Sequence, residues 1–153
     1  MLNYKIICKF NETKGFSIVE TMIVIALIIV ISTITGPMFS NHVKNINLKE
    51  AAGVLMSDIK LAKQKSATQG TNITIIINQD NNSYSFLGAT KNLSAFGNGI
   101  IIKDNNFSAN TIHFQSRGTC SPGGSIMLGN SLGSNIKIIV SPVGRVRSVE
   151  TYK

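Results

Sequence analysis

Hydrophobic positions along this chain follow three successive patterns, and the first is a long apolar run. It extends from Phe16 to Phe39, and Met22–Ile31 within it contains no polar residue. About 20 apolar residues are enough for a helix to cross a membrane. We therefore predict a membrane-embedded helix over residues 16–37. Gly36-Pro37 should kink or locally interrupt it, because proline removes a backbone donor and crowds the preceding turn.

The second pattern is that of an amphipathic helix. Apolar or small residues recur at alternating spacings of four and three, which brings them to one face of a helix. Gln69-Gly70 is a typical helix end. The positions predicted to face a core are Leu48, Ala52, Leu55, Ile59, Ala62 and Ser66.

The third pattern, after Gly70, is that of short strands. The stretches with strand character are 72–78, 83–87, 99–103, 111–115, 125–128, 136–140 and 145–150. Residues 79–82 between the first two predict a hairpin turn. The polar, flexible stretches predicted as loops are 88–98, 117–124 and 129–135. A long helix followed by a mostly antiparallel sheet predicts an α+β fold.

Composition sharpens this picture mainly through charge. The 153 residues include 15 Lys and Arg, 7 Asp and Glu, and two Cys, with a net charge of +8. So few cysteines exclude a disulfide-stapled scaffold. Residues 1–15 carry a net +2, which the positive-inside rule places in the cytoplasm. Residues beyond Pro37 carry twelve Lys and Arg against five Asp and Glu, so most of the positive charge belongs to the exported part.

Residues with catalytic or metal-binding chemistry are sparse. His42 and His113 are the only histidines, and the acids beyond Pro37 form no spaced pair or recognisable metal motif. No phosphate loop, dinucleotide fingerprint or triad signature is present in the sequence. We therefore expect no enzymatic activity, no metal site and no cofactor.

The residues before the apolar run carry a recognisable motif. Lys14–Glu20 reads KGFSIVE, with Gly15-Phe16 in place of the small-residue cleavage site of an ordinary secretory signal. Glu20 lies inside the apolar run, where a carboxylate is costly and points to function. An alternative is that Glu20 lies near the helix end and reaches the lipid headgroups. The motif resembles the processing site of type IV pilins and type II secretion pseudopilins, and Pro37 falls where these proteins usually have a kinking proline.

That resemblance implies three segments. Residues 1–15 would be a leader cleaved after Gly15 by a prepilin peptidase, and the new terminal Phe16 would be N-methylated. Residues 16–37 would anchor the chain as a single span in the bacterial inner membrane and later lie in the filament core. There Glu20 would offset the Phe16 amine of a neighbouring pilin. Residues 38–153 would form the globular domain in the periplasm, and then in the pilus at the cell surface.

A second resemblance covers the C-terminal half. Phe114–Gly118 (FQSRG), a glycine-rich loop and Ile138–Arg147 (IIVSPVGRVR) resemble the GspH/FimT group of minor pilins and pseudopilins. The order of these segments after the processing motif is also that of the group. The resemblance implies a type IV pilin-like fold, with a long N-terminal helix packed on the sheet.

The arginines suggest a binding function. Arg145 and Arg147 are two residues apart, so on a strand they share a face at about 6.5–7 Å from each other. Guanidinium groups bind phosphate bidentately. Gly144–Arg147 is similar to the GRxR pattern through which FimT-type minor pilins bind DNA during natural transformation. The resemblance implies that Arg145 and Arg147 contact phosphates of duplex DNA and that Gly144 shapes the turn, with pilus retraction then drawing the DNA inward.

Charge and proximity in the sequence add further cations to this site, and other functions stay open. The additional candidates are Lys137, Arg117 and Lys153. The arginines could instead be a solvated strand edge that discourages aggregation. The chain would then be a minor pilin that primes or caps assembly without binding DNA. A third reading is the H-type pseudopilin of a type II secretion system.

Overall fold

The computed structural model describes residues 15–152, without the side chains of residues 34–37. The predicted leader up to Lys14, as well as Lys153, lies outside the described residues. Helix α1 (Ile18–Gln69) is followed by eight strands and two short 3-10 helices. The chain divides into two compact units, Met1–Met38 and Phe39–Lys153, which are described separately below.

The first unit is an exposed apolar helix. Ser17 caps it, since its hydroxyl oxygen accepts a hydrogen bond from the Val19 amide at 3.3 Å. Every described side chain from Ile18 to Thr33 is exposed. The helical backbone continues through Gly36 and Pro37, so the proline does not end the helix. By length and composition, no single helix of the described residues qualifies as a membrane span. The two parts of α1 on either side of residues 34–37, Ile18–Thr33 and Met38–Gln69, qualify only as a pair.

The second unit begins with the amphipathic part of α1. All six residues predicted to face a core are buried, with exposed fractions of 2% or less. Gly70 follows the helix with a φ of +63°, the left-handed conformation that commonly ends helices. The predicted face and the predicted helix end are therefore confirmed.

The strands form two antiparallel four-stranded sheets, where the sequence suggested one. The first sheet has the order β3-β2-β1-β5 and the second has the order β4-β6-β7-β8. The strands of the first sheet are β1 (Ile73–Asn78), β2 (Ser83–Phe86), β3 (Ala89–Asn92) and β5 (Thr111–Phe114). Those of the second sheet are β4 (Ile101–Asn105), β6 (Gly124–Gly129), β7 (Asn135–Val140) and β8 (Val146–Thr151).

Strand β3 corrects the sequence prediction, which assigned residues 88–98 to a loop. The polar sequence of Ala89–Asn92 gives no strand signal, and a 3-10 helix follows it at Leu93–Phe96. The strand forms because Leu87 and Gly88 adopt positive φ values of 52° and 82°, which reverse the chain tightly after β2. Pairing with β2 then supplies the hydrogen bonds of β3.

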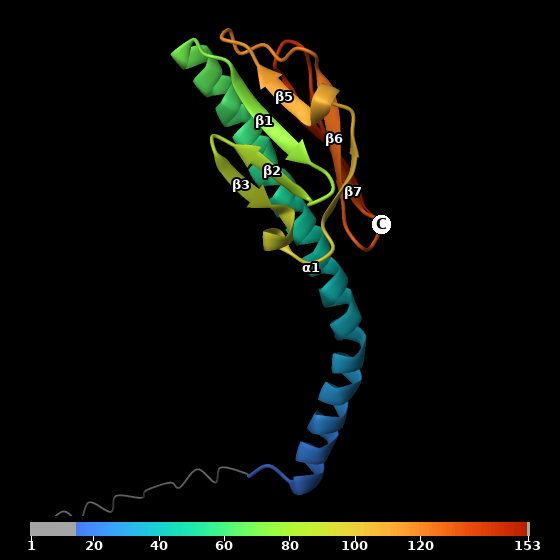
Figure 1. Cartoon of the computed structure of the whole chain (residues 1–153). Coiled ribbons are helices and arrows are strands. Elements are labelled where there is room, and N and C mark those ends of the chain that lie inside the picture. The colour runs from blue at the N-terminus through green and yellow to red at the C-terminus, as the bar shows by residue number, and fades with distance from the viewer. Residues whose placement is uncertain (1–14, 153) are drawn as a thin grey trace, which may run out of the picture. The chain divides into compact units, whose positions relative to one another are not determined.

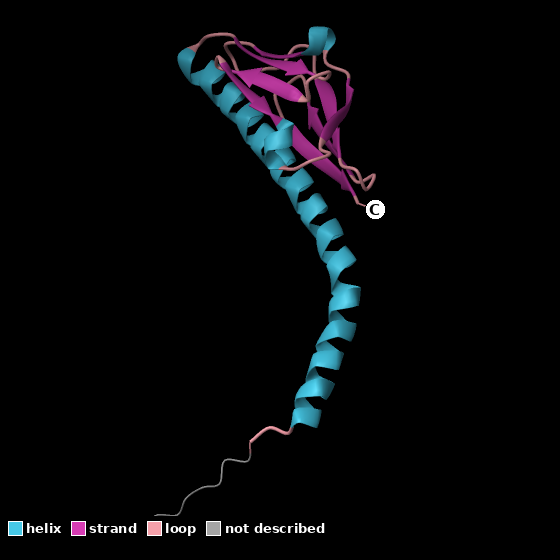
Figure 2. Cartoon of the chain, turned by 60° about the horizontal axis from the view of Figure 1, so that its bottom comes forward, coloured by secondary structure: helices cyan, strands magenta, loops and turns pink. Residues whose placement is uncertain are grey.

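Both sheets share one hydrophobic core with α1. Figures 1 and 2 show the helix lying along the strands of this second unit. The loop between β6 and β7 is tied to the helix by Asn130, whose side-chain amide donates hydrogen bonds to Asn45 Oδ1 at 2.8 Å and to the Lys44 carbonyl at 3.3 Å. The core and these ties fix the second sheet, which carries the candidate arginines.

Candidate functional site

The candidate arginines lie on the hairpin between β7 and β8. The Gly144 amide donates to the Ser141 carbonyl at 2.8 Å, which closes the turn. The Ser141 amide donates to the Arg145 carbonyl at 2.9 Å, so the strand register extends one residue beyond β8. Arg147 pairs with Ile139 and Val140 pairs with Val146 in the same register. Arg145 therefore lies opposite Ser141, although β8 itself starts at Val146.

This register places both arginines on one face, as the sequence predicted. Ile136, Ile138 and Val140 of β7 point into the core, so the alternate positions point outward. Arg147 lies opposite the outward Ile139. Arg145 and Arg147, with Ile139, Ser141 and Val143, line a hollow of about 400 Å³ on this outer face. Arg145 and Arg147 thus border a single depression whose lining includes no aromatic residue.

Lys137 lies on the same outer face. It pairs with Val149, which puts it diagonally across from Arg147 on the neighbouring strand. Its side chain is half-buried and lines an adjoining hollow that also includes Ile139 and Ser141. The structure therefore places Lys137 on the strand face of Arg145 and Arg147.

Arg117 lies in the loop that touches the arginine turn. Gly144 has a φ of +72°, and a side chain there would collide with the carbonyl oxygen of Gly118. The Cys120 amide also donates to the Pro142 carbonyl at 2.9 Å. Because Arg117 directly precedes Gly118, the structure brings its segment against the segment of Arg145. Both turn shape and close approach require glycine at position 144.

In the described part of the chain, the cations of this site have no acidic partner. Among residues 15–152, leaving aside the side chains of 34–37, Lys91–Asp58 is the only salt bridge. Asp104 is the acid on the outer face of the second sheet, but it lies on β4 opposite Met127, on the far side of β6 from Lys137. The positive charges at the hairpin are therefore available to an external anion.

Sequence reasoning missed one cation beside the arginine turn and another on the outer face of the second sheet. The side chain of Lys63 on α1 runs beside Gly144, with Cε 3.1 Å from where a Gly144 Cβ would lie. The side chain of Lys103 on β4 lies directly over Gly129, on the outer face of the second sheet. Helical spacing places Lys63 only off the face of α1 that carries Leu48 and Leu55. Its neighbours depend on tertiary packing, for which the sequence carries no local signal.

In the first sheet, a cation forms a salt bridge with an acid of α1, Lys91 with Asp58. Asp58 is buried on α1, and its Oδ2 accepts hydrogen bonds from the Tyr84 hydroxyl at 2.6 Å and from Lys91 Nζ at 2.7 Å. Burial, together with the neighbouring Asp58 carboxylate, raises the pKa of Tyr84 well above its usual value. This cluster links α1 to β2 and β3, and sequence reasoning gave Asp58 no role.

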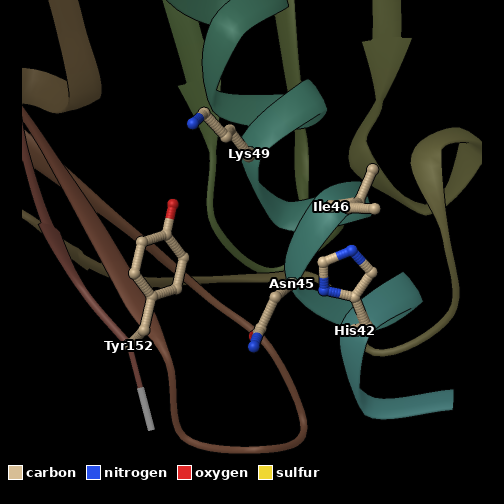
Figure 3. Close-up of a pocket in the computed structure, with 5 residues that line it drawn as sticks. All are labelled: His42, Asn45, Ile46, Lys49 and Tyr152. Carbon is tan, nitrogen blue, oxygen red and sulfur yellow. The ribbon is translucent and has the colours of Figure 1, made fainter. Parts of the chain in front are cut away.

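A groove lies between α1 and the end of β8. Figure 3 shows the ring of Tyr152 facing the helix, which carries Lys49, Asn45, Ile46 and His42. The groove has a volume of about 320 Å³. The Tyr152 hydroxyl donates to Glu150 Oε2 at 2.7 Å, and burial with this contact raises the pKa of Tyr152 to about 12. These residues bring together an imidazole, an ammonium and a phenol, without an assembled nucleophile and base.

Other potentially reactive side chains are buried or contact a neighbouring side chain. Cys120 is fully buried, and burial raises the pKa of its thiol, which disfavours the nucleophilic thiolate. His113 lies within 3.2 Å of Thr74 Oγ1, on the outer face of the first sheet. In the described part of the chain, no three His, Cys, Asp or Glu residues are grouped so as to hold a metal ion.

The predicted processing and assembly residues lie in the first unit. Gly15 and Phe16 precede α1, and the Phe16 side chain is 82% exposed. Glu20 is in the first turn of the helix and is also exposed. A carboxylate there interacts favourably with the positive end of the helix dipole. Gly15 and Phe16 are both exposed in this structure.

No protein-family model matches the sequence, and no curated protein matches it either. Two solved structures resemble the fold. One is the minor pseudopilin EpsH from the type 2 secretion system of Vibrio cholerae, with a TM-score of 0.59 and 12% identity over 68% of this chain and 97% of that one. The other is the type IV minor pilin FimU of Pseudomonas aeruginosa, with a TM-score of 0.53 and 16% identity over 67% of this chain and 92% of that one. The chain therefore has the α+β fold of type IV pilin-like minor pilins and pseudopilins.

Proposed function

We propose that this chain is a minor type IV pilin of the GspH/FimT group that binds DNA and supports DNA uptake in natural transformation. The observation that carries the proposal is the hollow bordered by Arg145 and Arg147, whose guanidinium groups have no acidic partner among the described residues. Lys137 on the same face and Arg117 in the adjoining loop extend the positive surface. The function is binding, without an enzymatic step or a cofactor.

The site suits the phosphate backbone of a duplex. Planar guanidinium groups contact phosphate oxygens in pairs, and such contacts carry no base sequence. The absence of an aromatic residue from the hollow lining disfavours base stacking on single strands. The proposal therefore implies duplex binding with little sequence preference. A few exposed contacts bind weakly, so several subunits along a pilus would add avidity.

The first unit supports a role in a filament. Its helix exposes large apolar side chains from Ile18 to Ile31, which need cover from lipid or from neighbouring helices. We propose that a prepilin peptidase cleaves after Gly15 and that the chain is stored in the inner membrane. It then assembles with other pilins, where Glu20 pairs with the Phe16 amine of a neighbour and so removes the cost of two buried charges.

A second candidate function is that of an H-type pseudopilin in a type II secretion system. The resemblance to EpsH, a minor pseudopilin, favours it. In that case, or in a pilin that only primes or caps the filament, the arginines would serve subunit contacts or solubility. DNA affinity separates these functions from the proposed one.

The test is a titration of the fragment of residues 39–153, which contains the whole core, with a short duplex. With about three phosphate contacts, affinity should fall about 40-fold between about 50 and 200 mM salt. Arg145→Ala with Arg147→Ala should lower affinity at low salt by about 10-fold or more and should reduce the salt slope by about two.

The matched control removes two charges from the far end of the same unit. Lys44→Gln with Lys49→Gln leaves the arginine hairpin intact and should change affinity by less than about three-fold. No binding at low salt, or equal losses in the two double variants, would contradict the DNA proposal and favour a pseudopilin or priming role.

A further inference from the structure

We infer that Lys63 of α1 is a further phosphate-contacting residue of this DNA site, which would then be built from three separate chain segments. The inference rests on the proposed DNA-binding function and extends it to the helix. The segments are the end of α1, the loop at 115–119 and the turn at 141–145. They meet where Gly118 touches Gly144.

The side chain of Lys63 lies along this junction. Its Cγ is 3.5 Å from the position that a Gly118 Cβ would occupy, and its Cδ and Cε are 3.3 and 3.1 Å from that of Gly144. The stem therefore passes from the loop to the turn. Since Arg145 follows Gly144 and Arg117 precedes Gly118, Lys63 approaches both arginine-bearing segments from the helix side.

The charge of Lys63 is available for an external anion. Its side chain is half-buried, and the one salt bridge of the described residues is formed elsewhere, by Lys91 and Asp58. The two glycines leave room for the lysine stem, because neither carries a side chain that would cover it. Because the stem of Lys63 is partly buried, its ammonium group is restricted to one area, which lowers the entropy cost of binding a phosphate.

The end of α1 also needs this cation if DNA is to approach. The last turn of a helix carries about half a negative charge, which repels phosphate. No basic residue lies in the last turn of α1, so Lys63 and Lys65 in the preceding turns must offset this charge. Phosphates could then be held on both sides of the turn at 141–145, by Lys63 on one side and by Arg145 and Arg147 on the other.

The experiment compares Lys63→Gln with Lys49→Gln in the fragment of residues 39–153. Both variants remove one charge from the same helix, but Lys49 is about 21 Å farther along the axis from the junction. We expect Lys63→Gln to weaken duplex binding about three- to ten-fold at low salt and to reduce the salt slope by about one. Lys49→Gln should weaken it by less than about two-fold.

The variant Lys63→Arg distinguishes a phosphate contact of Lys63 from a role in packing. It keeps the charge and should retain affinity within about two-fold, whereas a packing role would make Lys63→Arg and Lys63→Gln equally weak. Equal effects of Lys63→Gln and Lys49→Gln, while the paired arginine variant still loses binding, would overturn only the role of Lys63. Absence of binding by the unaltered fragment would instead overturn the proposed function.

Discussion

The outer faces of the two sheets differ in charge, although both sheets cover the same core. The first sheet presents Thr74, Ile76 and Asn78 from β1 and Thr111 and His113 from β5, without an Asp, Glu, Lys or Arg among these residues. Its remaining positions on this side, on β2 and β3, are Ser85, Thr90, Asn92 and the buried Ser83. The second sheet presents Lys103, Lys137 and Arg147 together with Asp104, and Arg145 continues its register.

The difference shows where cations stabilise the fold and where they remain available to an external anion. The one lysine of the first sheet, Lys91, lies on the helix-facing side and pairs with Asp58. The cations of the second sheet face outward and have no acidic partner among the described residues. Substitutions in the first sheet should therefore change stability, whereas substitutions on the outer face of the second sheet should change binding.

The largest effect should come from Asp58→Ala. The substitution leaves the buried Tyr84 hydroxyl and the Lys91 ammonium without their acceptor, and should lower the free energy of unfolding by about 3 kcal/mol. Urea unfolding of residues 39–153 measures this change. Asp80→Ala, at an exposed turn, is the control and should stay within about 0.5 kcal/mol.

The paired variant Arg145→Ala with Arg147→Ala is the counterpart of Asp58→Ala on the second sheet, and its unfolding is measured in the same way. Because both arginines are exposed and have no acidic partner among residues 15–152, leaving aside the side chains of 34–37, the free energy of unfolding should change by about 0.5 kcal/mol or less. A loss comparable to that of Asp58→Ala would show that the outward cations also stabilise the fold, and would remove the contrast between the sheets.

The next largest effect compares two turn glycines, Gly88 between β2 and β3 of the first sheet and Gly144 between β7 and β8 of the second. Gly144 and Gly88 both have positive φ values, +72° and +82°, but only Gly144 is in close contact, with the Gly118 carbonyl and Lys63. Gly88→Ala should cost about 1 kcal/mol from backbone strain alone, whereas Gly144→Ala should cost about 2–3 kcal/mol and also weaken DNA binding by displacing Arg145. Urea unfolding and duplex titration measure the two changes. Equal costs would mean that the turn shifts away from Gly118 without difficulty.

The local features of this fold could be predicted from sequence, because their signals are local. Three- and four-residue spacing gave the buried face of α1, and two-residue alternation gave the shared face of Arg145 and Arg147. Strand β3 was missed because pairing with β2 overrides its polar sequence. The division into two sheets and the approach of Lys63 to Gly144 depend on contacts between distant segments, which no spacing rule contains.

Alkaline pH should weaken the first sheet through Tyr84. Its pKa is raised in the folded state, so the unfolded chain loses the proton first, near pH 10. The free energy of unfolding should therefore be constant from neutral pH to about pH 9 and should fall as the pH rises above about 10. Tyrosinate absorbance measures the titration, since residues 39–153 contain only Tyr84 and Tyr152.

Tyr152→Phe isolates the Tyr84 signal. In the unaltered fragment, Tyr152 should titrate at a pH of about 12, and the variant should remove that step. The remaining phenol should resist ionisation until the fold opens, because it is buried against the Asp58 carboxylate. Ionisation of folded Tyr152→Phe near pH 10 would contradict the burial and hydrogen bonding of Tyr84.

The smallest expected effect comes from substituting one lysine in each sheet, which again compares the two sheets. Lys137→Gln and Lys91→Gln remove the same charge, but Lys137 faces outward beside Arg147, whereas Lys91 is held by Asp58. Lys137→Gln should weaken duplex binding about two- to three-fold and leave unfolding unchanged. Lys91→Gln should leave binding unchanged and lower the free energy of unfolding by about 0.5–1 kcal/mol, a modest cost because the Lys91 side chain is 41% exposed. Equal effects of the two variants on binding would mean that DNA responds to the total charge of the domain, and that the position of the cations on the second sheet does not matter.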